Sequence, residues 1–311
     1  MIVVILIVIA MLILIQAVSM FVYDMNFNRN SKSFGKFSFS INEKYKQAYL
    51  KQYVASEDTK DRFKGLAQEW NIISKDNLKL VAHFLKNDSH KYIIFCHGYT
   101  GRYYDLMNLA FEFYDKGFNC LMPEARGHGK SEGKYVGMGY LDRDDNKKWI
   151  DKIIEVDSEA QIVLYGVSMG GYNVMATMCY YHPANLKCVV EDSGYRSLLE
   201  QVEHISANNY KIKSNRIAKW ASYMSKNLAH YSFEETDIRD AISKNVVPIL
   251  FIHGSKDVTV PKENAIELYE LNKGDKELLI VDDAEHLSSI VVEPYKYRKT
   301  LFGFIDKYIS G

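Results

Sequence analysis

Hydrophobic and polar positions divide the chain into three parts. In residues 1–23, 21 positions are apolar and only Gln16 and Ser19 interrupt them. Residues 24–60 are rich in Asn, Lys, Ser and Tyr and show no long apolar period, which predicts a tether and a short linking helix. From residue 61 to residue 311, short apolar runs alternate with longer amphipathic stretches. This last part therefore predicts one folded domain of strands and helices.

The short apolar runs predict buried strands. Several of them lack the alternation of a strand with one wet face, as expected for strands covered on both faces in a mostly parallel sheet. The predicted strands are Leu78–Phe84, Tyr92–Cys96, Asn119–Pro123, Ile162–Tyr165, Cys188–Glu191, Val247–Ile252 and Glu277–Val281.

The amphipathic stretches between these runs predict helices, and strand and helix in alternation indicate βαβ units. The predicted helices are Tyr104–Lys116, Leu141–Glu155, Gly171–Tyr181, Glu263–Leu271 and Pro294–Ser310. The interval 195–243 contains no strand candidate, only helical sequence with several aromatic residues. Because a structureless loop of that length is unusual in a folded domain, we expect a helical cap inserted over the sheet.

The amino-terminal apolar segment has the length of a membrane span. As a helix, Met1 to Tyr23 would extend about 34 Å, and a bilayer core is about 30 Å thick. We therefore expect a single-pass membrane anchor, with a cleaved signal peptide or a buried core helix as alternatives. The basic residues Arg29, Lys32 and Lys36 follow the segment and would favour a cytoplasmic domain, but they leave the side of the membrane open.

The charge balance and the cysteine spacing exclude some classes of partner and site but do not identify a function. The chain has 39 basic and 39 acidic side chains, a balance that argues against a nucleic-acid partner. The four cysteines show no CxxC spacing, and no cluster of His, Cys and carboxylates predicts a metal site. The oligomeric state is not indicated.

The strongest chemical motif is Gly166-Val167-Ser168-Met169-Gly170, which follows a predicted strand and precedes a predicted helix. This strand–turn–helix context is the one in which a G-x-S-x-G motif exposes a nucleophilic serine. The turn strains the serine backbone, and Gly166 and Gly170 provide the small neighbours that it requires. Ser168 is therefore the predicted nucleophile.

A serine nucleophile requires a base and an orienting acid. His286 follows the predicted strand Glu277–Val281, and Asp257 follows Val247–Ile252. Both positions are at carboxyl ends of strands, where open α/β sheets place their active sites. His286 is thus the predicted base and Asp257 the predicted acid, with Asp192 as the alternative acid.

Two backbone N–H groups should stabilise the oxyanion. The amide of Met169, next to the nucleophile, is one expected donor. The amide of Tyr99 is the other, since Gly98 would let the loop after Tyr92–Cys96 approach the substrate. His97 is expected to support this loop through a buried ring rather than to bind metal.

Together these motifs resemble the α/β-hydrolase superfamily. The matching residues are His97-Gly98, Arg126-Gly127-His128-Gly129 with Ser131 and Gly133, Gly166-x-Ser168-x-Gly170, Gly254-x-x-Asp257 with Val260-Pro261, and His286. Within the superfamily the chain is similar to membrane-anchored bacterial cell-surface (BAAT/S9-like) serine hydrolases. The resemblance implies an α/β-hydrolase fold without a cofactor, acting on esters, thioesters, amides or peptides.

We therefore expect a serine hydrolase that works through an acyl-enzyme on a small-molecule or lipid-like acyl substrate. Peptidase or acyltransferase chemistry on the same triad, and an inactive binding protein of this fold, are the alternatives. Neither composition nor motif selects the substrate.

Overall fold

The computed structural model describes residues 2–35, 43–210 and 215–310, and an eight-stranded mixed sheet runs through this part of the chain. The strands follow the order β1-β2-β4-β3-β5-β6-β7-β8. Strand β2 pairs antiparallel with β1 and β4, whereas the pairs from β4 to β8 are all parallel. The strands are β1 (Ala67–Ile73), β2 (Lys79–Leu85), β3 (Lys91–Cys96), β4 (Asn119–Pro123), β5 (Gln161–Val167), β6 (Leu186–Asp192), β7 (Ile249–Gly254) and β8 (Lys276–Val281).

The seven predicted strands correspond to β2 through β8, and the mostly parallel sheet implied by the resemblance is confirmed. Strand β1 was not predicted. It lies at the edge of the sheet, and its first residues include the exposed Gln68 and Glu69. A strand that is half exposed and pairs on one side produces no continuous apolar run, so its sequence carries little signal.

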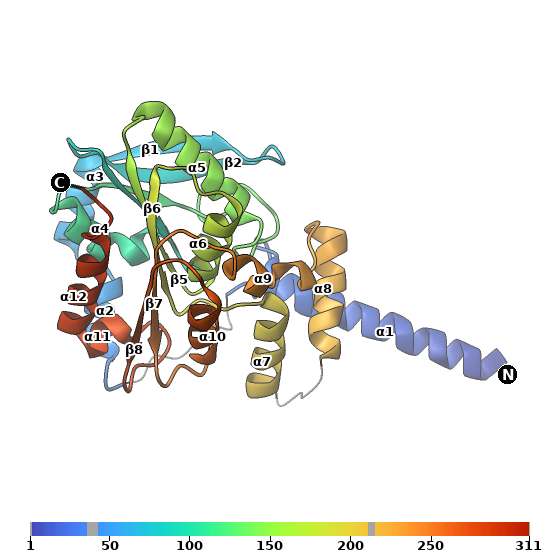
Figure 1. Ribbon diagram of the computed structural model, residues 1–311. Helices are drawn as coiled ribbons and strands as arrows, with labels where there is room; N and C mark the ends of the chain where they lie inside the picture. Colours follow the sequence, from blue (N-terminus) through green and yellow to red (C-terminus); the bar gives the residue numbers. More distant parts are fainter. Residues whose placement is uncertain (1, 36–42, 211–214, 311) are drawn as a thin grey trace.

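Helices cover both faces of the sheet (Figure 1). One face packs against α2 (Lys46–Tyr53), α3 (Glu57–Leu66), η1 (Tyr103–Leu106), α4 (Met107–Tyr114), α11 (Ser289–Val292) and α12 (Pro294–Ile305). The other face packs against α5 (Asp142–Val156), α6 (Met169–Tyr180) and α10 (Glu263–Leu271). In α5, buried Trp149, Ile150 and Ile153 recur at helical spacing and turn one face toward the sheet.

The interval 195–243 contains α7 (Leu198–Tyr210), α8 (Arg216–Leu228), η2 (Glu234–Thr236) and α9 (Arg239–Ile242). Its described part includes no strand, and residues 211–214 of the predicted cap lie outside the described residues. Figure 1 shows α7 and α8 beside the sheet, with α8 next to the amino-terminal helix. These helices occupy the place of the predicted cap, while the division into domains stays a prediction.

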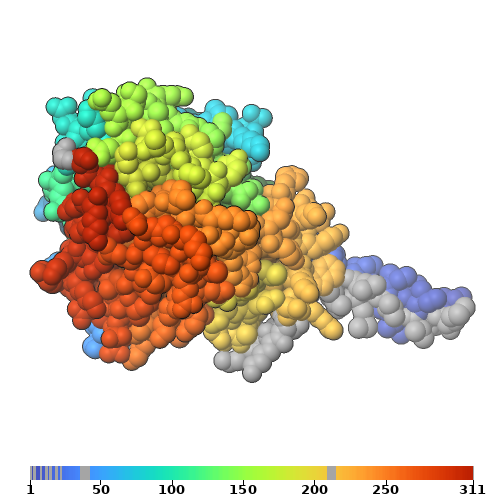
Figure 2. All heavy atoms as spheres, viewed as in Figure 1, coloured from blue at the N-terminus to red at the C-terminus, as the bar shows by residue number. Residues whose placement is uncertain are grey.

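The amino-terminal helix α1 (Ile2–Phe27) requires a correction. Among the residues that the structure describes, no helix combines the length and apolar character that a bilayer span needs. The prediction of a membrane localisation through an anchor at residues 1–23 is therefore wrong. The helix continues past the apolar segment, and its last turns belong to the protein core, where Tyr23 is 1% exposed and Phe27 6% exposed. Figure 2 shows α1 extending from the domain beside α8.

The segment after α1 lies against the domain. Asn28 forms a β-bridge with Tyr135, and the backbone N–H of Arg29 donates to the carbonyl of Lys134 at 3.0 Å. Residues 36–42 of the predicted tether lie outside the described residues. The predicted linking helix corresponds to α2, which is followed by α3.

Candidate active site

Ser168 lies in the tight turn between β5 and α6. Its backbone has φ 55° and ψ −116°, a strained conformation for a residue with a side chain. The turn leaves no room for larger neighbours: a Cβ at Gly166 would lie 2.1 Å from the Gly170 carbonyl oxygen, and a Cβ at Gly170 would lie 2.0 Å from that of Cys96. The two glycines therefore permit the turn that presents the Ser168 hydroxyl.

The structure brings Ser168, His286 and Asp257 together. The Nε2 atom of His286 lies 2.9 Å from Oγ of Ser168, and its Nδ1 lies 2.7 Å from Oδ2 of Asp257. Ser168 is half-buried, whereas His286 is 5% exposed and Asp257 7% exposed. The hydroxyl is thus the accessible end of a chain of three groups whose other members are shielded from water.

Backbone groups fix the Asp257 carboxylate. Its Oδ1 accepts hydrogen bonds from the N–H groups of Thr259 at 2.9 Å and Val260 at 2.8 Å, which leaves Oδ2 for His286. Burial raises the pKa of Asp257, but the charge of His286 and a hydrogen bond from His253 outweigh burial and hold it well below its usual range. This carboxylate is therefore ionised at neutral pH.

His253 is a neighbour of the acid that the sequence did not reveal. Its Nε2–H donates to the Val260 carbonyl at 2.8 Å and lies 3.3 Å from Oδ2 of Asp257. Burial lowers the pKa of His253, but its contacts with Asp257 raise it above the ordinary value. The available signal was its place directly after the predicted strand Val247–Ile252 and directly before Gly254.

Asp192, the alternative acid, is engaged elsewhere. It is fully buried at the end of β6, where its carboxylate accepts hydrogen bonds from the hydroxyls of Tyr297 and Ser193, both at 2.8 Å. Burial raises its pKa. The hydrogen bond that His286 Nδ1 makes to a carboxylate goes to Asp257. The geometry therefore favours Asp257 over Asp192 as the partner of the imidazole.

The loop after β3 lies against Ser168. A Cβ at Gly98 would stand 3.5 Å from Cβ of Ser168, so the loop passes beside the nucleophile, and Tyr99 is its next residue. Met169 begins α6, and the first N–H groups of a helix have no acceptor within it. Met169 and the loop that contains Tyr99 therefore flank Ser168 from two different elements.

His97 and His128 connect this loop to the one after β4. The ring of His97 donates from Nδ1 to the Gly98 carbonyl at 2.8 Å and accepts at Nε2 from the Ala125 N–H at 3.0 Å. His128 accepts at Nε2 from the Thr100 N–H at 3.2 Å. Burial lowers the pKa of both rings, which keeps them neutral and able to accept. Each histidine thus ties one loop to the other.

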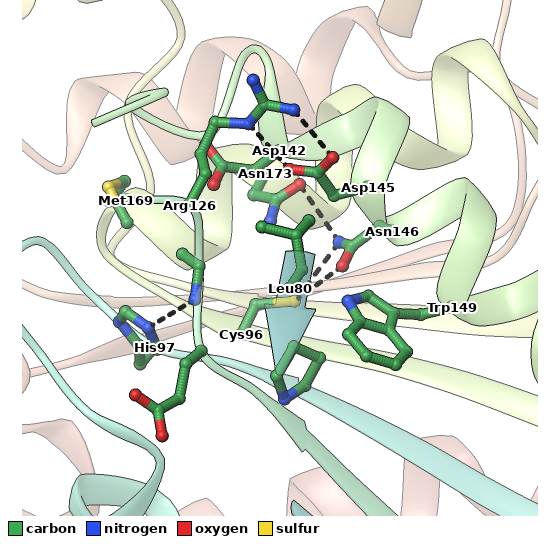
Figure 3. Close-up of a pocket in the computed structure, with 13 residues that line it drawn as sticks. Leu80, Cys96, His97, Arg126, Asp142, Asp145, Asn146, Trp149, Met169 and Asn173 are labelled. Carbon is green, nitrogen blue, oxygen red and sulfur yellow. Dashed lines mark hydrogen bonds and ion pairs between the residues drawn. The ribbon is translucent and has the colours of Figure 1, made fainter. Parts of the chain in front are cut away.

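A small cavity lies behind this loop pair (Figure 3). Its volume is about 20 Å³, and its lining includes His97, Met169, Asp142 and Asn146. A volume of this size holds roughly one water molecule. Ser168, His286 and Asp257 are not among its lining residues. In the described part of the chain, no three His, Cys, Asp or Glu side chains gather into a metal-binding group.

Comparisons with known proteins agree with this fold. The family model described as "Serine aminopeptidase, S33" matches residues 87–231. The Pyrococcus furiosus esterase Pf2001 superposes with a TM-score of 0.66 and 26% sequence identity, over 83% of this chain and 98% of the esterase. The chain belongs to the α/β-hydrolase superfamily and is a hydrolase.

Two further proteins are similar over most of this chain. The uncharacterised Bacillus subtilis protein YqkD is 27% identical over 225 residues, which are 72% of this chain and 74% of YqkD. The acylaminoacyl peptidase of Pyrococcus horikoshii shares the fold with a TM-score of 0.60 and 17% identity, over 81% of this chain and 44% of the peptidase. The superfamily expected from the sequence motifs is confirmed, and esterases and peptidases are both among its similar structures.

Proposed function

We propose that the protein is a serine hydrolase that cleaves an ester, thioester or amide through an acyl-enzyme. The observation that carries this proposal is the line of contacts from Ser168 through His286 to Asp257, at 2.9 Å and 2.7 Å. It joins a hydroxyl, an imidazole and an ionised carboxylate in the order that nucleophilic catalysis requires.

In the proposed mechanism, Ser168 Oγ attacks the acyl carbon while His286 Nε2 takes the hydroxyl proton. The tetrahedral intermediate collapses when the imidazolium gives this proton to the leaving group. A water molecule, deprotonated by the same nitrogen, then attacks the acyl-enzyme, and the imidazolium returns this proton to Ser168 Oγ as the acid is released. Asp257 holds Nδ1–H of His286, so that Nε2 is the free base, and stabilises the imidazolium that forms.

The oxyanion is assigned to the backbone N–H groups of Met169 and Tyr99. The place of Gly98 against Ser168 and the start of α6 at Met169 support this assignment. Preformed donors of this kind contribute more than any other single interaction in many acyl transfers, because they require no reorganisation when charge develops. The proposed substrate is a small-molecule or lipid-like acyl compound.

The test compares Ser168→Ala with the unchanged protein on p-nitrophenyl acetate and butyrate. We expect the variant to lose at least about 10⁴-fold in kcat and to fail to react with a fluorophosphonate probe. Equal turnover by the two proteins would refute the proposal. Labelling of the unchanged protein at another residue would refute the assignment of the nucleophile.

A peptidase is the second candidate, and the match to the family described as a serine aminopeptidase favours it. The same assay with aminoacyl p-nitroanilides separates the two candidates. Since both use the same acyl-enzyme, the ratio of kcat/KM for matched ester and anilide substrates decides between them. Esters are intrinsically the easier substrates, so an esterase should give a large ratio of ester to anilide kcat/KM. A ratio near one would identify a peptidase.

A further inference from the structure

The last turn of α1 and the segment that follows it reach the proposed oxyanion loop. We name residues 24–35 the strap. The Tyr99 hydroxyl donates a hydrogen bond of 2.6 Å to the carbonyl of Asn26 in the strap. The ring of Phe34, at the other end of the strap, meets the Tyr99 ring edge-on at 5.5 Å and the His128 ring at 6.0 Å. Two parts of the strap therefore hold the side chain whose own backbone is the proposed donor.

The strap is fixed in turn to the loop after β4. The Val136 N–H donates to the Phe27 carbonyl at 2.9 Å, and the Arg29 N–H donates to Lys134 at 3.0 Å. The Arg29 guanidinium donates to the carbonyl of Gly129 at 2.6 Å and to that of Ser131. This loop is the one that His128 connects to Thr100. The strap, the β4 loop and the oxyanion loop thus form a closed ring of contacts around Tyr99.

The oxyanion loop needs such support. Thr100 has φ 58°, in the left-handed region that a β-branched residue rarely adopts. A conformation of this kind persists only when the surroundings hold it. The His128 contact holds the Thr100 amide, whereas the Asn26 carbonyl and Phe34 hold the side chain of the preceding Tyr99.

We propose that the strap is part of the catalytic apparatus: through the Tyr99 hydroxyl it positions the Tyr99 backbone N–H as an oxyanion donor. The inference rests on the proposed function, in which this N–H binds the oxyanion. The Tyr99 hydroxyl and Arg29 are positioning groups, because they act on the reacting atoms through the loop backbone. An oxyanion donor that is displaced weakens the transition state more than it weakens substrate binding.

The first test is Tyr99→Phe in the full chain, which removes the hydroxyl and keeps the backbone donor. We expect kcat for p-nitrophenyl butyrate to fall about five- to tenfold, in keeping with the loss of one hydrogen bond, while KM changes less than twofold. Affinity for a trifluoromethyl ketone, which forms a tetrahedral adduct with the serine, should fall by a similar factor.

The matched control is Tyr195→Phe. The Tyr195 hydroxyl also donates to a backbone carbonyl at 2.6 Å, that of Met138, so this variant loses a hydrogen bond of the same kind. We expect its melting temperature to fall about as much as that of Tyr99→Phe, with kcat and ketone affinity unchanged. A merely structural role of the Tyr99 hydroxyl would make the two variants alike in activity as well.

The second test is Arg29→Met, which loosens the strap without altering Tyr99 and decides the matter if Tyr99→Phe does not fold. We expect kcat to fall with KM unchanged, and the double variant to lose less than the product of the two single losses, because both act on one ring of contacts. Wild-type kcat in both single variants, or losses in KM alone, would overturn the proposal. Full activity of Ser168→Ala would refute the proposed function itself. An inactive Ser168→Ala together with strap variants of wild-type activity would refute the strap proposal alone.

Discussion

Replacement of Asp257 by asparagine tests the proposed triad at the point where the structure makes the sharpest prediction. Oδ1 of Asp257 accepts two backbone hydrogen bonds, from Thr259 and Val260, and Oδ2 accepts one from His286. In Asp257→Asn, the amide oxygen should keep the place of Oδ1, because an NH₂ group there would face two donors. The NH₂ group then points at Nδ1 of His286.

This arrangement inverts the imidazole tautomer. An NH₂ group can only donate, so Nδ1 must accept and the ring proton moves to Nε2. A protonated Nε2 cannot take the Ser168 proton. We therefore expect kcat to fall about 10³- to 10⁴-fold, or about 4–5.5 kcal/mol in activation free energy, with KM little changed.

The assay is the steady-state hydrolysis of p-nitrophenyl butyrate, with Asp192→Asn as the matched control. Asp192 accepts from two hydroxyls, and an amide oxygen can still accept from one of them. We expect Asp192→Asn to change stability but to keep kcat within about tenfold. If Asp192→Asn lost activity and Asp257→Asn did not, the assignment of the acid would be refuted.

Three further predictions concern stability. A Cβ at Gly166 would lie 2.1 Å from a carbonyl oxygen, whereas one at Gly303, inside α12, has open space within 4 Å. In urea unfolding, Gly166→Ala should therefore lower the free energy of unfolding by about 3 kcal/mol or more, and Gly303→Ala should raise it by about 0.5–1 kcal/mol. Burial raises the pKa of Glu191 to about 8 from an ordinary 4.5. The folded state therefore holds this proton more tightly than the unfolded state, so the carboxyl lowers stability as pH rises from about 5 to 8. The gain from Glu191→Gln should grow over that range, by at most about 1.4 kcal/mol per pH unit, and a gain independent of pH would contradict this account. Arg126 makes two hydrogen bonds of 2.8 Å to the buried Asp145. Arg126→Met leaves that carboxylate without this partner and should lower the free energy of unfolding by about 3–5 kcal/mol in the same measurement. A loss below about 1 kcal/mol would exclude this pair as a source of stability.

Much of the fold could be predicted from the sequence because its core strands are short apolar runs in the chain. Strand β4, for example, is buried at all five positions, and its predicted bounds Asn119–Pro123 are those of the structure. The elbow at Ser168 was equally visible, since glycine on both sides of the turn is a steric requirement. Where a residue's environment is set by its immediate neighbours in the chain, the pattern predicts the structure.

The amino terminus shows where this reasoning fails. The apolar run in residues 1–23 does not show which of its residues contact the rest of the domain: Ile2 and Ile13 are exposed, whereas Tyr23, at the end of the run, is buried. The contacts of this end of the helix are tertiary. Tyr23 stacks on Phe27 with ring centroids 4.6 Å apart, and Phe27 meets Phe233 at 5.4 Å, more than two hundred residues along the chain.

The candidate site contains residues that the sheet positions and a loop that contacts between distant segments position. Ser168, Asp257 and His286 follow β5, β7 and β8, and parallel strands bring their carboxyl ends to one edge of the sheet. The proposed oxyanion loop depends instead on contacts between distant segments, such as Tyr99 with Asn26 and Ala125 with His97. Substitutions in the strands remove buried apolar area and should lower stability first. Substitutions in the loop contacts remove single hydrogen bonds beside the reacting atoms, so they should lower turnover while the fold persists.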